Sequence, residues 1–291
     1  MTQRYSSHAR NFIRKLGCMK DEQLHFTLVH DAEHKNQAYS YSSNYPAMAL
    51  HKPLYLLERL APRITLFSKK NYLIHVFSQN IKGYAVFMEI NYRETRKSDF
   101  KKIRAQFIDV DLNKISEHLQ TKDQVQERMR SLQSDPTEKL LSITIKRNKQ
   151  GHYHLLALRT KERVAALKKE FMQKHKRRIK DTMIIETKNG YHIYWVLQGG
   201  SINHFVPIQK ALAQKFGSDP MITNLSRVMR LPGFYHMKNP ESPFMVRVRQ
   251  WGRKKRFTQK ELIRSLALKP VFTVKAGRKL RKAPVLQLSR V

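Results

Sequence analysis

The sequence IRAQFIDVDL, residues 103–112, combines a strand-like pattern with two closely spaced aspartates. Its aromatic and β-branched residues favour a β-strand. Because side chains alternate between the two faces of a strand, Asp109 and Asp111 share one face, while Ile108 and Val110 pack on the other. Carboxylates this close repel each other unless a cation such as Mg²⁺ or Mn²⁺ neutralises them. The alternative is a solvated strand end whose acids pair with lysines and arginines.

A second motif follows in a predicted hairpin. Strand-like segments over 182–187 and 191–197 flank Lys188-Asn189-Gly190, which is typical of a type I′ turn. On the second strand, His192 and Tyr194 share one face, so His192 is expected to point into a cleft opposite the carboxylate pair. There the imidazole and the N–H groups of the turn are suited to holding the phosphates of a nucleotide. The alternative is a histidine that is hydrogen-bonded for structural reasons.

A third motif, DPMITNLSRVMRLPG, covers residues 219–233. Arg227 and Arg230 are three residues apart, so on a helical turn they would lie on one face as a fork for a triphosphate. From the residues alone, Asp219 before Pro220 is more typical of a helix N-cap.

The composition indicates a nucleic-acid partner and excludes several classes of protein. The 57 Lys and Arg residues outnumber the 22 Asp and Glu residues, which leaves a formal net charge of +35. Such an excess needs a polyanion. Hydrophobic residues make up 41% of the chain, so we expect folded domains and not a basic disordered tail. The absence of G-x-x-x-x-G-K-[ST] and G-x-G-x-x-G motifs argues against a nucleotide-driven motor or a dinucleotide-dependent enzyme.

Cysteine content and hydropathy bear on the environment of the protein. The single cysteine, Cys18, excludes an internal disulfide and a cysteine-based zinc site. No apolar run approaches the roughly 20 residues that cross a bilayer, and residues 1–20 lack the apolar centre of a signal peptide. We therefore expect a cytoplasmic protein with no membrane partner.

The remaining sequence is organised around these motifs. We expect a helical or mixed N-terminal segment (1–70) packed on a core (71–255), and a C-terminal helix with a basic tail (256–291). An insertion over 135–181 interrupts the core. Further strands are predicted at Tyr72–Ser78, Tyr84–Ile90, Leu140–Ile145, His152–Leu158 and Phe244–Trp251. Helices are predicted at Asn113–Gln133, Lys161–Lys180, Ile202–Phe216 and Thr258–Leu266.

Taken in order, the three motifs resemble motifs I, II and III of the archaeo-eukaryotic primase superfamily. The chain is most similar to the primase-polymerases of plasmids and other mobile elements, the RepB-like type, and the resemblance runs from about Tyr84 to Lys238. It implies an α/β (α+β) catalytic core, in which an RRM-like antiparallel sheet carries the metal-binding strand and a flanking αβ unit supports the nucleic acid.

The resemblance also implies roles for individual residues. Asp109, Asp111 and Asp219 would be the catalytic residues and the ligands of two Mg²⁺ or Mn²⁺ ions. Many relatives have a serine where this chain has Gly190, so a phosphate contact at that point must come from the backbone, Thr187 or Asn189. The residues implied to bind the nucleotide are Asn189, His192, Arg227, Arg230 and Lys238.

The function implied is DNA-templated synthesis of primers or DNA from nucleoside triphosphates on a single-stranded template, in the replication of a plasmid or other mobile element. A helicase or replication protein would be supplied in trans. The insertion departs from the family pattern in its length, and the excess of basic residues in its cationic helix predicts contact with the template, the alternative being a solvated basic helix. Two other functions are considered: a non-catalytic initiator or single-stranded DNA-binding protein, and a nicking endonuclease of the HUH type using His152-Tyr153-His154.

Overall fold

The structure is a computed structural model that describes residues 2–18, 23–31, 40–46, 80–93 and 100–272. The helices in this part of the chain are α1 (Thr2–Leu16), α4 (Lys122–Ser134), α5 (Lys161–Ile179), α6 (Ile202–Phe216) and α7 (Gln259–Ser265). The strands are β1 (Gln23–His30), β2 (Ser40–Pro46), β3 (Tyr84–Glu89), β4 (Tyr92–Arg93), β5 (Phe100–Lys102), β6 (Ala105–Asp111), β7 (Lys114–Leu119), β8 (Leu140–Arg147), β9 (Tyr153–Arg159), β10 (Met183–Glu186), β11 (Gly190–Val196), β12 (Val228–Arg230), β13 (Tyr235–His236), β14 (Phe244–Met245) and β15 (Arg247–Gln250).

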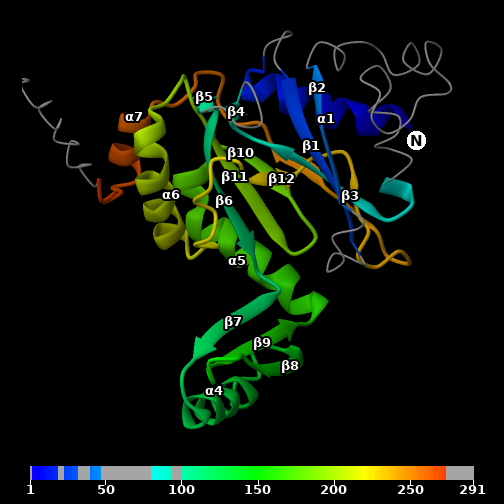
Figure 1. Cartoon of the computed structure of the whole chain (residues 1–291), viewed down its shortest axis with the longest axis vertical. Coiled ribbons are helices and arrows are strands. Elements are labelled where there is room, and N and C mark those ends of the chain that lie inside the picture. The colour runs from blue at the N-terminus through cyan, green and yellow to red at the C-terminus, as the bar shows by residue number, and fades with distance from the viewer. Residues whose placement is uncertain (1, 19–22, 32–39, 47–79, 94–99, 273–291) are drawn as a thin grey trace, which may run out of the picture.

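The fold is mixed α/β and contains several antiparallel sheets (Figure 1). One four-stranded sheet has the order β15-β10-β11-β6 and is called the central sheet here. A second, the N-terminal sheet, has the order β12-β3-β1-β2. A three-stranded sheet, β7-β9-β8, forms the protruding sheet, and β4–β5 and β13–β14 are short pairs.

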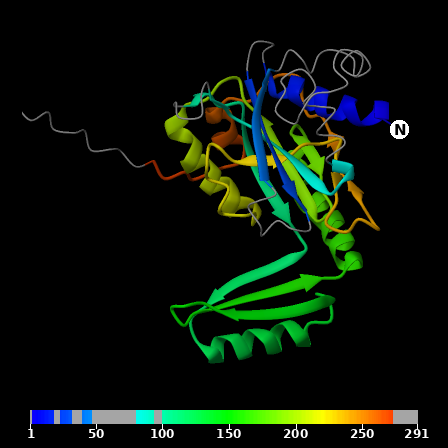
Figure 2. The same cartoon turned by 45° about the vertical axis from the view of Figure 1, so that its right-hand side comes forward.

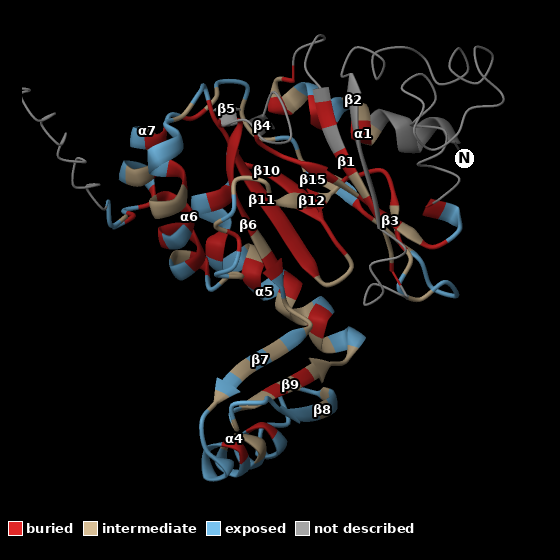
Figure 3. Cartoon of the chain, in the orientation of Figure 1, coloured by how far each residue is buried: buried red, intermediate tan, exposed pale blue. Residues whose placement is uncertain are grey.

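The central sheet is buried on both faces. Every residue of β10 and β11 is buried, as the colouring of Figure 3 shows for both strands. On one face, Phe171 of α5 stacks on Tyr191, and Phe216 of α6 packs against Trp195. On the other face, the ring of Phe12 in α1 packs against Tyr194, with 5.4 Å between the ring centroids. Each such large apolar side chain contributes about 1.5–3 kcal/mol by leaving water.

A glutamine on α6 fixes the edge strand β6. The side-chain oxygen of Gln209 accepts a hydrogen bond from the N–H of Phe107 at 3.0 Å, and its amide donates to the Phe107 carbonyl at 2.8 Å. A third hydrogen bond links Gln209 to Gln106, and all three residues are buried. These bonds satisfy backbone groups of an edge strand, which would otherwise be costly to bury, and so hold the strand that carries Asp109 in place.

Residues 114–159 form a separate module, which we call the protruding module. β6 leads almost directly into β7, and the module then adds α4, β8 and β9 around a small core of Leu132, Leu155 and Ala157. Figures 1 and 2 show it extending away from the rest of the chain, with α4 on the side of the protruding sheet that faces away from the body. α5 then returns the chain to the central sheet.

Most of the elements expected from the sequence are present. The strands around Tyr84–Ile90, Leu140–Ile145 and His152–Leu158 and the hairpin before His192 are confirmed. The helices at Lys161–Lys180, Ile202–Phe216 and Thr258–Leu266 are confirmed as α5, α6 and α7. The expected strand at Tyr72–Ser78 and most of the basic tail lie outside the described residues, whereas Phe244–Trp251 is divided into β14 and β15.

Two expectations for secondary structure are wrong. A single helix over Asn113–Gln133 is replaced by β7 followed by α4. The helix begins only after Thr121, because Thr121 and Gln124 form a reciprocal capping box. Residues 1–70, expected to be helix and loop, also contain β1 and β2, whose partner β3 lies far along the chain.

Within the described ranges, none of the helices combines the length and the apolar character that crossing a bilayer requires.

Candidate active site

A cavity of about 300 Å³ opens between the central and N-terminal sheets. Strands β1, β3 and β12 contribute to one wall, and β6 and β11 contribute to the other. Residues from all three sequence motifs meet here, although Asp219 and Arg227 do not line the cavity. The lining residues are Val29, Asp31, Phe87, Asp109, Asp111, Lys114, Thr187, Asn189, His192, Arg230, His236 and Lys238.

The register of β6 against β11 places the acidic pair beside the histidine. Asp109 lies opposite His192, and Asp111 lies opposite Gly190. The Nε2 atom of His192 is 3.6 Å from Oδ1 of Asp109. Ile108 on the same strand is buried on the opposite face. Both carboxylates and the imidazole therefore face one cavity.

The electrostatics of the cavity disfavour a charged Asp109 when no cation is bound. Burial and the nearby carboxylate of Asp111 raise the pKa of Asp109 to about 7. Arg227 opposes this shift, and Asp219 adds to it. The acidic charge around Asp109 is thus only partly compensated, and a bound cation would lower this pKa again.

Asp219 lies beside β6, but its carboxylate is engaged within its own loop. Its N–H group donates a hydrogen bond to the carbonyl of Asp109 at 3.2 Å. Its carboxylate accepts a hydrogen bond from the N–H of Met221 at 2.8 Å and lies 3.5 Å from the guanidinium of Arg227. In the part of the chain that the structure describes, no three acidic, histidine or cysteine side chains gather closely enough to hold one metal ion.

The remaining donor set suits a hard divalent cation. Asp109 and Asp111 offer carboxylate oxygens on one face of β6, and Mg²⁺ is commonly held by one or two carboxylates together with the phosphates of a substrate. The Asp111 carboxylate also accepts a hydrogen bond from the N–H of Asn113 at 3.0 Å and pairs with Nζ of Lys114 at 3.2 Å. A metal ion at this position would therefore compete with an ammonium group for Asp111.

The two arginines of the third motif do not share a helical turn, so that expectation is wrong. Arg230 belongs to β12, which pairs with β3 in the N-terminal sheet. Its guanidinium forms two hydrogen bonds with the carboxylate of Asp31, at 2.6 and 3.2 Å, and lies over the ring of Phe87. Arg227 instead faces Asp219.

Arg230 therefore lines the cavity, while Arg227 lies in the adjacent loop and lowers the pKa of Asp109 from there. His192 is a neutral imidazole at ordinary pH, because burial, Arg230 and Arg227 lower its pKa to about 3. Its Nδ1 atom lies 3.5 Å from the hydroxyl of Tyr194. A neutral imidazole can donate one N–H to a phosphate oxygen without adding a charge.

Asn189 and Lys238 also line the cavity, from the β10–β11 turn and the loop after β13. Lys238 is exposed, so its ammonium group is accessible to a ligand. Both residues therefore lie in the same cavity as Asp109 and His192.

Sequence reasoning missed three polar residues of the cavity, Asp31, Lys114 and His236, and two apolar ones, Val29 and Phe87. Asp31 follows β1, a strand that the sequence pattern did not predict, and its contact with Arg230 spans 199 positions. Lys114 was assigned to a helix. An acidic residue directly after an apolar strand-like run, LHFTLVHD, is the local signal that could have drawn attention to Asp31.

The hairpin before His192 is confirmed, but its turn is not type I′. Type I′ turns need positive φ angles at both central residues, and Lys188, Asn189 and Gly190 all lack them. Gly190 is required for a different reason. A Cβ atom at this position would lie 1.7 Å from the carbonyl oxygen of Val110, so any side chain would force β6 and β11 apart. A serine at position 190 would therefore not fit this backbone without a shift.

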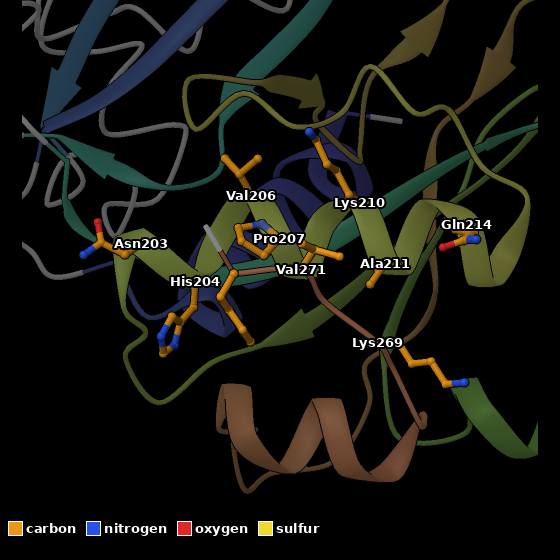
Figure 4. A pocket seen from close by; sticks show the side chains of 10 residues that line it. Asn203, His204, Val206, Pro207, Lys210, Ala211, Gln214, Lys269 and Val271 are labelled. Atoms are coloured by element: carbon orange, nitrogen blue, oxygen red, sulfur yellow. The ribbon is translucent and has the colours of Figure 1, made fainter. Parts of the chain in front are cut away.

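A larger cavity, of about 480 Å³, lies on the outer side of α6 next to Lys269–Phe272 (Figure 4). Its polar side chains include Asn203, His204 and Lys210. No carboxylate lines this cavity, and none of its lining residues comes from β6 or β11. Cavity volume alone therefore does not identify the active site, and the smaller cavity, which Asp109 and His192 line, is the better candidate.

The histidines considered for a nicking endonuclease do not form a metal centre. The ring of His154 stacks on His118, and its Nε2 atom is 2.9 Å from the hydroxyl of Ser116. His152 is exposed in the loop before β9. Among the described residues, no third ligand gathers beside them.

Comparisons with solved structures give two similar folds. The crystal structure of primase RepB′ is 12% identical, with a TM-score of 0.47, and the match covers 90% of this chain and 62% of that chain. The crystal structure of the catalytic domain of primase RepB′ in complex with initiator DNA is 11% identical, with a TM-score of 0.48, and the match covers 90% of this chain and 93% of that chain. This chain thus spans 62% of the length of the first structure. No curated protein matches the chain.

The comparison with protein families gives a match over more than half of the chain. The RepB DNA-primase N-terminal domain matches residues 101–276, which include β6, the hairpin with His192 and the third motif. DNA primases are nucleotidyltransferases, the class of enzyme that the three motifs predict. The chain therefore belongs to the RepB DNA-primase N-terminal domain family.

Proposed function

We propose that this chain is a DNA-templated primase-polymerase that makes primers or DNA on a single-stranded template, in the replication of a plasmid or other mobile element. The observation that carries the proposal is the meeting of Asp109, Asp111 and His192 in one cavity, with Arg230 and Lys238 in the same lining. Acidic and basic groups are both needed there, because nucleotidyl transfer requires ligands for metal ions and partners for phosphates.

The family implies two Mg²⁺ or Mn²⁺ ions, which we propose are held by Asp109, Asp111 and, after a change in its loop, Asp219. When bound, such ions supply Lewis acidity that lowers the pKa of a 3′-hydroxyl and stabilises charge on the transferred phosphate. In the reaction, the 3′-oxygen of one nucleotide attacks the α-phosphate of the next, and pyrophosphate leaves.

The basic side chains orient the incoming nucleotide in this scheme. His192 donates an N–H to a phosphate oxygen, and Arg230, held by Asp31, presents its guanidinium from the opposite wall. Lys238 neutralises the leaving pyrophosphate from the loop after β13, while Arg227 and the Asn189 amide contact the phosphates from either side. Fixed donors of this kind reduce the cost of reorganisation during the reaction.

The test of the proposed function is synthesis by the full chain. The protein is incubated with a single-stranded DNA template, labelled nucleoside triphosphates or deoxynucleoside triphosphates, and Mn²⁺. Template-dependent products longer than two nucleotides are the expected result. Retention of DNA with no product under any nucleotide mixture would contradict a polymerase and favour the non-catalytic initiator. A helicase supplied by another protein stays a prediction.

Asp31 is predicted to position Arg230 for the nucleotide. Asp31→Asn is expected to raise the KM for the nucleotide about tenfold or more while kcat changes less, because a guanidinium in the cavity wall loses its charged partner. The side chains of Asp31 and Arg230 are only 6% and 17% exposed, so the loss of unfolding free energy should be about 3 kcal/mol. Steady-state kinetics and thermal unfolding measure the two effects.

The matched control for this prediction is Glu138→Gln, which removes the ion pair with Arg159 in the protruding module. This variant should lower stability without changing the KM for the nucleotide. An equal rise in KM in both variants would show that Asp31 acts only through general stability.

A further inference from the structure

The protruding sheet has one face that α4 does not cover. The covered face carries Ile115, Leu119, Leu155 and Ile143, which pack with α4 in the small core of the module. Side chains alternate along strands, so their neighbours in sequence lie on the opposite face. No described helix packs on that face, and Figures 1 and 2 show that it is directed toward the body of the protein.

The uncovered face carries a pair of stacked imidazoles. The register places His118 of β7 opposite His154 of β9, and His154 opposite Lys146 of β8. The two rings are 4.7 Å apart between centroids and inclined by 16°. The 2.9 Å contact between Nε2 of His154 and the hydroxyl of Ser116 holds the inner ring. His118 is exposed and lies on an edge strand, so its outer ring face is open.

The acids of the protruding module lie away from its uncovered face. Glu117 forms its ion pair with Arg128 of α4, and Glu138 forms its pair with Arg159. The other three acids of the module lie on α4 or in the loop that follows it: Asp123, Glu127 and Asp135. The uncovered face carries Lys114 and Lys146 but no acid, which makes it complementary to a phosphate backbone.

The uncovered face is continuous with the candidate active site. β7 begins three residues after Asp111, and Nζ of Lys114 pairs with that carboxylate at 3.2 Å. His118 lies four residues further along β7, which is about 13 Å of extended chain. A nucleic-acid strand that follows β7 away from Asp111 therefore reaches the imidazole pair.

We propose that the uncovered face of the protruding sheet binds the single-stranded DNA template, with a base stacked on His118 and phosphates paired with Lys146. The proposal rests on the proposed function and adds the residues that hold the template. Nucleic-acid-binding sheets commonly combine aromatic rings, on which bases stack, with flanking cations. A stacked imidazole pair beside a lysine, on a face free of acids, supplies both.

Fluorescence anisotropy with a labelled single-stranded 20-mer tests this proposal, with the full chain in EDTA and without nucleotides. The His118→Ala/His154→Ala variant is expected to bind about tenfold more weakly, the usual effect of losing one base-stacking contact. His118→Trp should bind as tightly as the wild type or more tightly, because a larger ring preserves stacking. This single substitution on an exposed strand also keeps the test informative if the double variant fails to fold.

The matched control is Lys122→Ala/Arg130→Ala on α4, at exposed positions on the other side of the module. It removes two charges but should change the dissociation constant less than twofold. A 20-mer of abasic sites has no bases to stack, so its affinity for the wild type should be about as low as the affinity of the normal 20-mer for the double histidine variant. The double histidine variant should bind the abasic 20-mer no more weakly than the wild type does.

Unchanged affinity of the double histidine variant would overturn the proposal and favour a protein partner for this face. An equal loss in the α4 control would also overturn it. The assay contains neither nucleotides nor divalent cations, so its outcome is independent of synthesis. If the chain proves unable to make primers, the proposed function fails, but the binding assay still decides whether the uncovered face binds single-stranded DNA.

Discussion

Replacing Asp109 with asparagine is expected to lower nucleotide transfer by at least about 10²–10³-fold. The side chain keeps its size and its place opposite His192, but it loses the charge that a divalent cation needs. Asp109 is the acid on which the cavity acts most strongly, since burial and Asp111 raise its pKa to about 7. Initial rates of template-dependent synthesis at saturating nucleotide measure the effect.

The control for Asp109→Asn is Asp123→Asn, an exposed aspartate in the first turn of α4. It removes the same charge from the same chain and should leave the rate within about twofold. Binding to single-stranded DNA should persist in both variants, because lysines and arginines supply most of the attraction to the backbone. A rate close to that of the wild type in Asp109→Asn would contradict the assigned role.

Removal of divalent cations is expected to abolish synthesis completely, and Mn²⁺ or Mg²⁺ should restore it. Ions that bind only the folded protein also stabilise it, by about 2.7 kcal/mol at a concentration one hundred times the dissociation constant. Mn²⁺ should therefore raise the Tm of the wild type, but raise it much less in Asp109→Asn. Activity that survives exhaustive chelation would contradict metal-dependent transfer.

The sequence predicts β6 and its neighbour well because their signals are local. Alternation along β6 predicts that Asp109 and Asp111 share a face, and the strands on either side of Lys188 are each recognisable from a few residues. α6 and α5 are equally clear because of their helical spacing, and α5 also has a definite start. Thr160 accepts the hydrogen bond that begins α5.

The features that the sequence did not predict depend on contacts between distant segments. β1 and β2 form a sheet only with β3 and β12, which lie far along the chain. Arg230 becomes a strand residue because β12 pairs with β3, and its partner Asp31 lies 199 positions away. The close approach of β6 to Gly190 is likewise invisible in a local pattern, which reads Asn-Gly as a turn.

The roles of the individual site residues remain predictions that rest on geometry and on family membership. Asp219 shows most clearly what sequence alone does not determine. Its N–H group donates a hydrogen bond to the carbonyl of Asp109, but its carboxylate is turned toward Met221 and Arg227. For Asp219 to act as a third carboxylate ligand, its loop would have to change, as we propose above.

Anomalous X-ray diffraction from a crystal of the protein with Mn²⁺ and a non-hydrolysable nucleoside triphosphate tests whether the β6 aspartates hold metal ions beside the nucleotide. We expect two manganese peaks beside the carboxylates of residues 109 and 111, one of them within reach of Asp219, with the triphosphate between them and Arg230. Manganese bound elsewhere, or a nucleotide seated in another cavity with the β6 aspartates free of metal, would contradict this expectation.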